Sequence, residues 1–363
     1  MTMSTRRVGL DVHARETAAA VLDPATGEVT IRTLSGRPSV VVEWLETLPA
    51  PFQAVYEAGP TGYGLVRAAR ARGLDVVVCA PGHIVRSKLD RVKTDKRDAI
   101  RLARLLLAGE LRMVRVPEPA EEQLRDLVRA REDLRVDLMR CRARIAKFLL
   151  RRELYYPLPG NTWTKRHRNW LRGLRFDDRA SELAFADALH AHDSMLARRD
   201  QLEAALEEIT LSSWAADTVA RLRCLRGIST LTAAGLTAEV CDFARFEHPR
   251  LLASYLGVVP SEDSSGEQRR QGAITKAGSK HARRLLVEAA WHYRRPPRVS
   301  HEVSVRQRGQ HPRVIDIAWR AQRRLYQRWQ TLEQQRGKRN TIVAVAVARE
   351  LAAFCWEVAT RKL

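Results

Sequence analysis

Apolar and polar positions alternate in short segments over the first 117 residues of the chain. This pattern predicts strands at residues 7–22, 28–34, 53–57 and 75–79, and helices at residues 40–48 and 64–72. The Asp-Pro-Ala-Thr-Gly turn at residues 23–27 separates the first two strand segments. Strands that come first and then alternate with helices indicate an α/β sheet covered by helices.

Beyond Pro117 and Pro119 the pattern becomes helical. Apolar residues recur in steps of three and four, broken only at Arg131, and form a heptad seam: Leu124, Leu127, Leu134, Leu138, Cys141, Ile145 and Phe148. A second helix extends to about residue 209, with one apolar face formed by Met195, Leu202, Leu206 and Ile209. We expect an antiparallel helical hairpin or coiled coil, which would serve either dimerisation or spacing.

From Trp214 onwards the pattern is mostly helical, and residues 341–356 are apolar enough for a core helix. The predicted fold class is therefore α/β plus all-α. We expect a mixed-sheet domain at 1–117, a helical hairpin at 118–212 and a helical domain at 213–363.

The net charge of the chain indicates which kind of molecule it binds. The 363 residues carry a formal net charge of +21, with a pI of about 10.6, which points to nucleic acid or, less specifically, to a basic surface. No apolar run is long enough to cross a membrane, and the N-terminus lacks a secretory signal, so we expect a cytoplasmic, nucleoid-associated protein. The five cysteines form no C-x-x-C pair, and His190 and His192 are expected on a solvated helix surface.

Four acids stand where apolar runs end or a helix begins. Asp11 follows Val8-Gly9-Leu10, Glu57 follows Ala54-Val55-Tyr56, and Asp95 and Asp98 form a D-x-x-D pair between a predicted cap, Thr94, and a predicted stop, Gly109. Acids that converge usually share a cation, and paired divalent ions serve phosphoryl transfer. The alternative is that Asp95 and Asp98 only complement the helix dipole. The order of the acids is typical of a RuvC-like, RNase H-like fold. Nearby cations suited to a phosphate backbone are Arg86, Lys88 and Lys93.

The second half of the chain has two candidate phosphate-binding features. Residues 225–229, around Gly227, resemble a helix-hairpin-helix turn, although Ser229 stands where a second glycine is usual, and an ordinary helix junction is the alternative. Ser265 precedes Gly266 in a polar segment predicted to be a loop, and is either a nucleophile on phosphorus or a simple loop residue. Cations that follow it, and that we expect to bind nucleic acid, are Lys276, Arg283 and Arg284. The Arg- and Trp-rich segments 165–175 and 320–328 are further candidates.

These segments together resemble the DEDD insertion-sequence transposases with a C-terminal catalytic serine, also called bridge-RNA-guided recombinases. The matching blocks are residues 9–13, 56–62, 93–99, 225–228 and 257–278, in the family's order. The resemblance implies that Asp11, Glu57, Asp95 and Asp98 bind two Mg²⁺ ions, which Mn²⁺ could replace. It implies that Ser265, or its neighbour Ser264, forms a phosphoserine link to DNA.

The implied partners are donor and target DNA, an element-encoded bridge RNA and further copies of the chain in a dimer or tetramer. Because the acids and the serine lie in separate predicted domains, we expect docking between subunits to assemble the site. Two alternatives remain open at this stage. One is a RuvC-like, metal-dependent junction nuclease without a serine step, and the other is a non-catalytic nucleic-acid-binding protein.

Overall fold

The structure, a computed structural model, describes residues 5–81, 94–265 and 268–361. Its contacts divide the chain into two compact units, Met1–Pro117 and Glu118–Leu363, which we describe separately. The predicted phosphate contacts Arg86, Lys88 and Lys93 lie outside the described residues.

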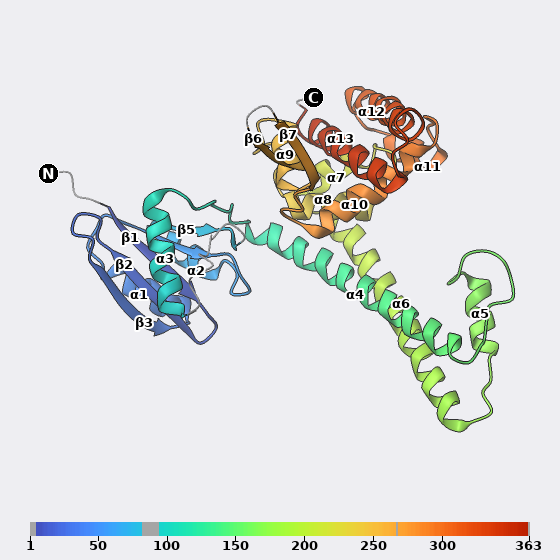
Figure 1. The fold of residues 1–363 in the computed structure, drawn as a ribbon, viewed down its shortest axis with the longest axis horizontal. Coiled ribbons are helices and arrows are strands. Elements are labelled where there is room, and N and C mark those ends of the chain that lie inside the picture. Colours follow the sequence, from blue (N-terminus) through green and yellow to red (C-terminus); the bar gives the residue numbers. More distant parts are fainter. Residues whose placement is uncertain (1–4, 82–93, 266–267, 362–363) are drawn as a thin grey trace. The chain divides into compact units, whose positions relative to one another are not determined.

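The first unit is built on a mixed five-stranded sheet. Its strands are β1 (Arg6–Val12), β2 (Glu16–Leu22), β3 (Val29–Ser35), β4 (Phe52–Glu57) and β5 (Val76–Cys79). They lie in the order β3-β2-β1-β4-β5, with β1 antiparallel to β2 and parallel to β4 (Figure 1). The helices are α1 (Pro38–Glu46), α2 (Gly64–Ala71) and α3 (Asp95–Ala108). The predicted α/β class of this part is confirmed.

One predicted strand is in fact two. The segment 7–22 turns back on itself after β1, and the amide of His13 donates to the carbonyl of Glu16 at 2.9 Å. Residues 13–15 are His-Ala-Arg and contain none of the glycine, proline or asparagine residues that usually indicate a turn, so composition gave no sign of the break. The remaining strands and helices lie within about two residues of their predicted bounds.

The two faces of the sheet are covered by different helices. Val8, Leu10 and Tyr56 are buried in one core with α1 and α2. On the other face α3 lies directly over Gly9, so closely that a Cβ atom on this glycine would lie 2.6 Å from the amide nitrogen of Ala103 and nearer still to the carbonyl oxygen of Ala99. Only a glycine lets α3 approach β1 to this distance.

Both predicted ends of α3 are confirmed. The hydroxyl of Thr94 accepts a hydrogen bond from the amide of Arg97, which satisfies one of the free donors at the helix start. Gly109 ends the helix in the left-handed conformation, with φ of 70°. The first turn of α3, which carries Asp95 and Asp98, is therefore held in a defined position against β1.

The second unit begins with a long helical hairpin. Helices α4 (Pro119–Leu150) and α6 (Arg179–Leu211) run antiparallel, since Arg131 pairs with Glu203 at one end and Arg152 donates to Ser181 at 2.7 Å at the other (Figure 1). Five of the seven predicted seam residues of α4 are buried, whereas Leu127 and Phe148 are half-buried beside the buried Val128 and Leu149. On α6 one prediction was wrong: Ile209 is 45% exposed, and its neighbour Thr210 takes the buried position.

An aromatic cluster closes the far end of the hairpin beside α5 (Lys165–Gly173). Here the solvated position predicted for His192 was wrong, because this side chain is 1% exposed and packs against Trp163 with ring centroids 4.7 Å apart. Burial lowers the pKa of His192, although Asp193 opposes the shift. His190 is exposed, as expected. The two histidines therefore do not share a surface.

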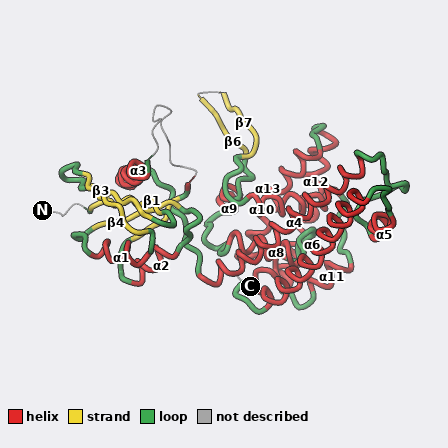
Figure 2. The backbone as a smooth tube through the Cα atoms, turned by 90° about the horizontal axis from the view of Figure 1, so that it is seen from below, coloured by secondary structure: helices red, strands yellow, loops and turns green. Residues whose placement is uncertain are grey.

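The rest of the second unit is a helical body with one hairpin of strands (Figure 2). Its elements are α7 (Ala216–Leu222), α8 (Thr230–Val240), α9 (Pro249–Tyr255), β6 (Pro260–Ser265), β7 (Gln268–Ile274), α10 (Lys280–Ala290), a 3-10 helix (Trp291–Arg294), α11 (His301–Gln307), α12 (Pro312–Gln330), a π-helical turn (Thr331–Gln335) and α13 (Asn340–Thr360). As predicted, α13 is a core helix.

The loop predicted around Ser265 is replaced by strand structure. Ser265 ends β6 and pairs with Gln268 of β7. The two strands read Pro-Ser-Glu-Asp-Ser-Ser and Gln-Arg-Arg-Gln-Gly-Ala-Ile, with almost no apolar residues. A hairpin with no apolar face lacks the alternation from which strands are predicted, which explains why the sequence suggested a loop.

Charged side chains join α4 to α10. Glu132 accepts from Arg135 within α4, at 2.8 and 2.7 Å, and from Arg284 of α10, at 3.2 and 2.6 Å. Burial alone would raise the pKa of Glu132, but the hydrogen bond from Arg135 and the charges of Arg284 and His281 hold it below its usual value. The ionised carboxylate thus stabilises the attachment of α10 to the hairpin.

We expect Glu132→Gln to lower the free energy of unfolding of the second unit by about 2 kcal/mol near pH 7. Because the folded-state pKa is lowered, this stabilisation is complete above pH 4.5 and disappears as the pH falls through the lowered value. Urea denaturation at several pH values measures both effects. Glu288→Gln is the matched control, since Glu288 pairs with the same Arg284 but is exposed and should contribute less than about 0.5 kcal/mol. Equal losses in the two variants would contradict the assignment.

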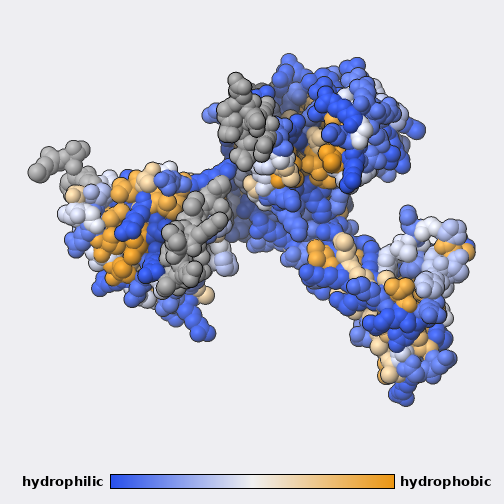
Figure 3. Space-filling view, viewed as in Figure 1, coloured by the Kyte–Doolittle hydropathy of each residue, from blue (hydrophilic) through white to orange (hydrophobic). Residues whose placement is uncertain are grey.

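The surface is largely hydrophilic, as Figure 3 shows for one face. Small hydrophobic areas appear at the far end of the helical hairpin, where Leu150 and Leu183 are exposed. Among the described residues, no helix is both long and apolar enough to cross a membrane.

Candidate metal centre

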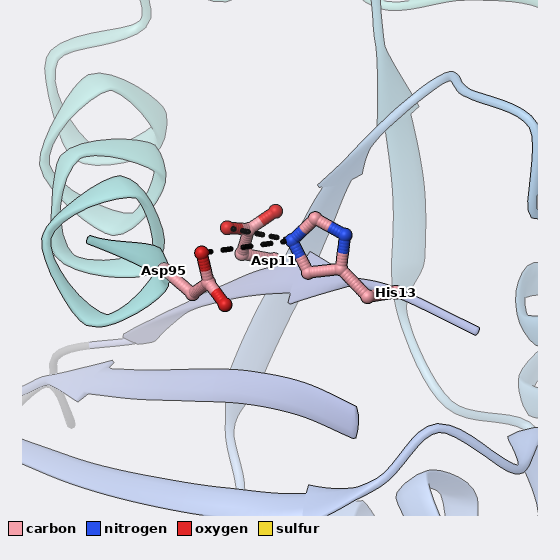
Figure 4. A group of neighbouring side chains, drawn as sticks. All are labelled: Asp11, His13 and Asp95. Atoms are coloured by element: carbon pink, nitrogen blue, oxygen red, sulfur yellow. Dashed lines mark ion pairs between the residues drawn. The ribbon is translucent and has the colours of Figure 1, made fainter. Parts of the chain in front are cut away.

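Alternation along β1 places Gly9 and Asp11 towards α3, because residues two apart in an extended strand share a face, and His13 follows directly after the strand ends at Val12. The first turn of α3 brings Asp95 to the same place. The Nε2 atom of His13 lies 3.4 Å from Oδ2 of Asp11 and 3.8 Å from Oδ1 of Asp95 (Figure 4). One ligand atom from each of these three residues lies within 4.8 Å of the other two.

Burial is the largest influence on the ionisation of Asp11. Burial raises the pKa of its carboxyl group; His13 opposes the shift, whereas the charges of Asp95 and Asp98 add to it. The ionised form of Asp11 is therefore disfavoured in the folded chain unless a positive charge is close. A bound divalent cation would provide that charge.

The other two predicted ligands, Asp98 and Glu57, are not members of this group of three. Asp98 accepts from Arg101 at 3.2 Å, one turn further along α3, and acts on Asp11 through its charge. Glu57 ends β4, the parallel neighbour of β1, and is exposed. Burial, followed by the charge of Glu57, raises the pKa of the Cys79 thiol on β5 to about 11. Asp11 and Asp95 thus converge, Asp98 is close to them, and Glu57 stands at the end of the adjacent strand.

The donor set suits a divalent cation. Two carboxylates and one imidazole nitrogen supply hard and borderline ligands, and their combined charge of about −2 matches such an ion when the ring is neutral. Burial of Asp11, which raises the pKa of its carboxyl group, disfavours the ionised form, and a cation bound beside it would favour that form. On both grounds the residues present fit the expected metal.

The base of the β6–β7 hairpin is tightly interlocked. Gly257 and Gly278 have φ of 67° and 64°, and a Cβ atom on either would collide with the backbone of the opposite segment. Arg283 of α10 donates to the carbonyl oxygens of Leu256 at 3.2 Å and Gly278 at 3.1 Å, and also to that of Ala277. The predicted nucleic-acid contact Arg283 thus has an internal role in joining both ends of the hairpin to α10.

Two comparisons with known transposases decide the family. Residues 8–152 match a DEDD transposase model of the IS110 type, and residues 219–303 match the model described as the IS116/IS110/IS902 transposase family. A putative transposase, y4qE, of Sinorhizobium fredii is 41% identical over 97% of this chain and 88% of its own length. The transposase for insertion sequence element IS1533 of Leptospira borgpetersenii is 32% identical over 91% of this chain and 97% of its own.

This chain belongs to the IS110/IS116/IS902 family of transposases. It is therefore an enzyme that cleaves and rejoins DNA. The first matched region of the transposase contains all four predicted acids, and the second contains Gly227 and Ser265.

The turn around Gly227 of the transposase joins α7 to α8. Gly227 has φ of 81°, and a Cβ atom there would lie 2.6 Å from the carbonyl oxygen of Ala289, while Ser229 caps α8 by accepting from Thr232. Arg226 and Arg306 line a neighbouring cavity of about 430 Å³. A phosphate contact at Gly227 stays a prediction, as do contacts at the exposed Lys276 and at Arg284, which pairs with Glu132 and Glu288.

Sequence reasoning assigned no role to His13 in this transposase. The available signal was the D-x-H spacing of Asp11 and His13, which places both side chains on one face of a strand. This spacing is a weak signal if the strand is predicted to continue to residue 22. In such a strand His13 would be an ordinary polar residue in the middle. The turn after Val12 is what leaves His13 at the edge of the sheet, beside the acids.

Proposed function

We propose that this transposase moves an insertion sequence by means of two chemical centres: a RuvC-like, RNase H-like acidic site that uses Mg²⁺, and a serine nucleophile at Ser265. The convergence of Asp11 and Asp95 beside α3 is the observation that carries the first part. A mixed sheet with acids at the carboxyl ends of the parallel strands β1 and β4 also supports the RNase H-like reading.

At the acidic centre, Asp11, Glu57, Asp95 and Asp98 would hold two Mg²⁺ ions. Such ions, when bound, polarise a phosphate and stabilise a leaving oxygen. The chain's own part is to supply the carboxylates on rigid elements. The close contact of α3 with Gly9 sets the separation of Asp95 from Asp11, and the ladder between β1 and β4 sets the position of Glu57.

At the serine centre, the Oγ atom of Ser265 would attack phosphorus. A P–O bond to Ser265 forms, the P–O bond to one DNA strand breaks, and that strand leaves as a hydroxyl. Attack by the hydroxyl of another strand on the phosphoserine reverses these bond changes and releases the serine. One phosphate ester is exchanged for another at each step, so strand exchange needs no ATP.

The partners we propose are donor and target DNA and a bridge RNA that pairs with both. The net charge of +21 supports binding to several phosphate backbones. Because the acids and the serine belong to different units, we propose a homo-oligomer, a dimer or tetramer, that brings them to one phosphate. Its place of action would be the cytoplasm, at the nucleoid. A monomer in sedimentation of the nucleic-acid complex would contradict the oligomer.

The test is a search for a covalent protein–DNA adduct after denaturation. The full-length protein is incubated with element-derived RNA, donor and target DNA, and Mg²⁺. We expect an adduct with the wild type and none with Ser265→Ala or Asp11→Ala. The matched control is Ser264→Ala, which removes the neighbouring hydroxyl and should leave the adduct in place. Loss in Ser264→Ala alone would move the nucleophile by one residue.

The same experiment distinguishes the alternative, a RuvC-like junction nuclease without a serine step. Cleavage with no adduct, abolished by Asp11→Ala and unchanged by Ser265→Ala, would support the nuclease and overturn the serine intermediate.

A further inference from the structure

The position of His13 between the two converging acids is not explained by four carboxylate ligands alone. Its Nε2 atom lies within 4 Å of a carboxylate oxygen of Asp11 and of one of Asp95. On the basis of the metal centre proposed above, we infer that His13 is itself a metal ligand and that it shifts the site's preference from Mg²⁺ towards Mn²⁺.

The distances from His13 to each acid are compatible with ligands on one ion, and the three ligand atoms lie within 4.8 Å of one another. Two ligands on one octahedral ion, each about 2.1 Å from it, can lie at most about 4.2 Å apart. The separations of Nε2 from the oxygens of Asp11 and Asp95, 3.4 and 3.8 Å, fall below that limit. An ion could therefore replace the direct contacts of His13 with both acids through small side-chain movements.

The backbone holds His13 in place before any ion binds. Its amide donates to the carbonyl of Glu16 at 2.9 Å, and the amide of Gly36 donates to the carbonyl of Arg15 at the same distance. A Cβ atom on Gly36 would lie 2.5 Å from the carbonyl oxygen of His13, so the turn after β1 packs tightly against this glycine. The ring itself is 51% exposed, which leaves room for a hydrated ion beside it.

The inferred selectivity follows from ligand chemistry. Mg²⁺ binds oxygen almost exclusively and keeps much of its water, whereas imidazole nitrogen favours first-row transition metals. Neutral His13 would offer the lone pair of Nε2 and keep its proton on Nδ1. A site with one nitrogen and two carboxylate ligands should therefore bind Mn²⁺ more tightly than a site with oxygen ligands alone, relative to Mg²⁺.

The experiment uses the full-length protein with Mn²⁺ alone as the probe. Electron spin-echo envelope modulation detects ¹⁴N bonded to Mn²⁺, and calorimetry gives the affinities for Mn²⁺ and Mg²⁺. We expect ¹⁴N modulation in the wild type and its loss in His13→Gln, with Mn²⁺ affinity at least about tenfold weaker and Mg²⁺ affinity nearly unchanged. His13→Asp should restore a preference for Mg²⁺. His190→Gln, which removes an exposed histidine elsewhere, is the matched control.

Different results would contradict the role of His13 and the proposed metal centre. One outcome would overturn the role of His13 and leave the metal centre intact. In it, the wild type binds Mn²⁺ without ¹⁴N modulation, and Asp11→Asn abolishes the binding. Modulation that persists in His13→Gln would overturn the role of His13 as well. Binding that is unchanged by Asp11→Asn, or no binding at all, would overturn the proposed centre and the inference with it.

Discussion

Asp11→Asn should reduce the rate of DNA strand cleavage by about a thousandfold, an effect of the size seen when one group that stabilises a transition state is removed. Asp11 is the most enclosed of the three converging ligands, with a side chain 20% exposed against 44% for Asp95 and 51% for His13. Asparagine keeps the shape but cannot supply the negative charge. Single-turnover cleavage in Mg²⁺ measures the loss.

Stability distinguishes a lost ligand from a damaged fold. Because burial raises the pKa of Asp11, ionisation of this group costs folding free energy at neutral pH, and the cost vanishes below its ordinary value of 3.8. Metal-free Asp11→Asn should therefore be at least as stable as the wild type at pH 7. Asp75→Asn, in an exposed acid of the same unit, is the matched control and should cleave normally. A variant that loses activity and stability together would contradict the ligand assignment.

Gly9→Ala should destabilise the first unit by about 3 kcal/mol and also abolish metal binding. The added methyl group would meet the α3 backbone at Ala99 and Ala103, and backbone cannot rotate away as a flexible side chain can. The helix must move outwards, and it carries Asp95 away from Asp11. Urea denaturation and Mn²⁺ titration measure the two effects.

The control for Gly9 is Gly64→Ala. Gly64 begins α2, and a Cβ atom there would meet nothing within 4 Å. Alanine also favours a helix, so this variant should be neutral or slightly more stable. If Gly9→Ala proved as harmless as Gly64→Ala, the close approach of α3 to β1 would not be what positions the acids.

The parts of the fold that were predicted correctly are those with strong local signals. Thr94 and Gly109 define α3 because a hydroxyl cap and a left-handed glycine act within one turn of the helix. The seam of α4 was visible because its apolar residues pack against α6 over many turns. The strands β1 and β4 were visible because both are apolar where they are buried, and each has an acid expected at the site in its last two residues.

What was missed depends on contacts between distant residues. His13 becomes a candidate ligand only when α3 brings Asp95 beside it, across more than eighty positions of sequence. His192 looked solvated because its partner, Trp163, comes from the break between two helices. Arg283 and Arg284 also have partners within the chain that the sequence did not indicate, carbonyl oxygens for Arg283 and Glu132 for Arg284, while their contacts with nucleic acid stay predictions. A charged residue in a sequence does not reveal whether its partner is a phosphate or its own chain.

The interlocked base of the β6–β7 hairpin makes the length of this hairpin important for the position of Ser265. With Gly257, Gly278 and Arg283 holding the base, the distance of Ser265 from α10 depends on the number of residues between Pro260 and Ser265. Removing one residue from each strand would withdraw the serine by about 3.3 Å and move it to the opposite face of the ribbon. The length of this hairpin would therefore determine how far the proposed nucleophile reaches.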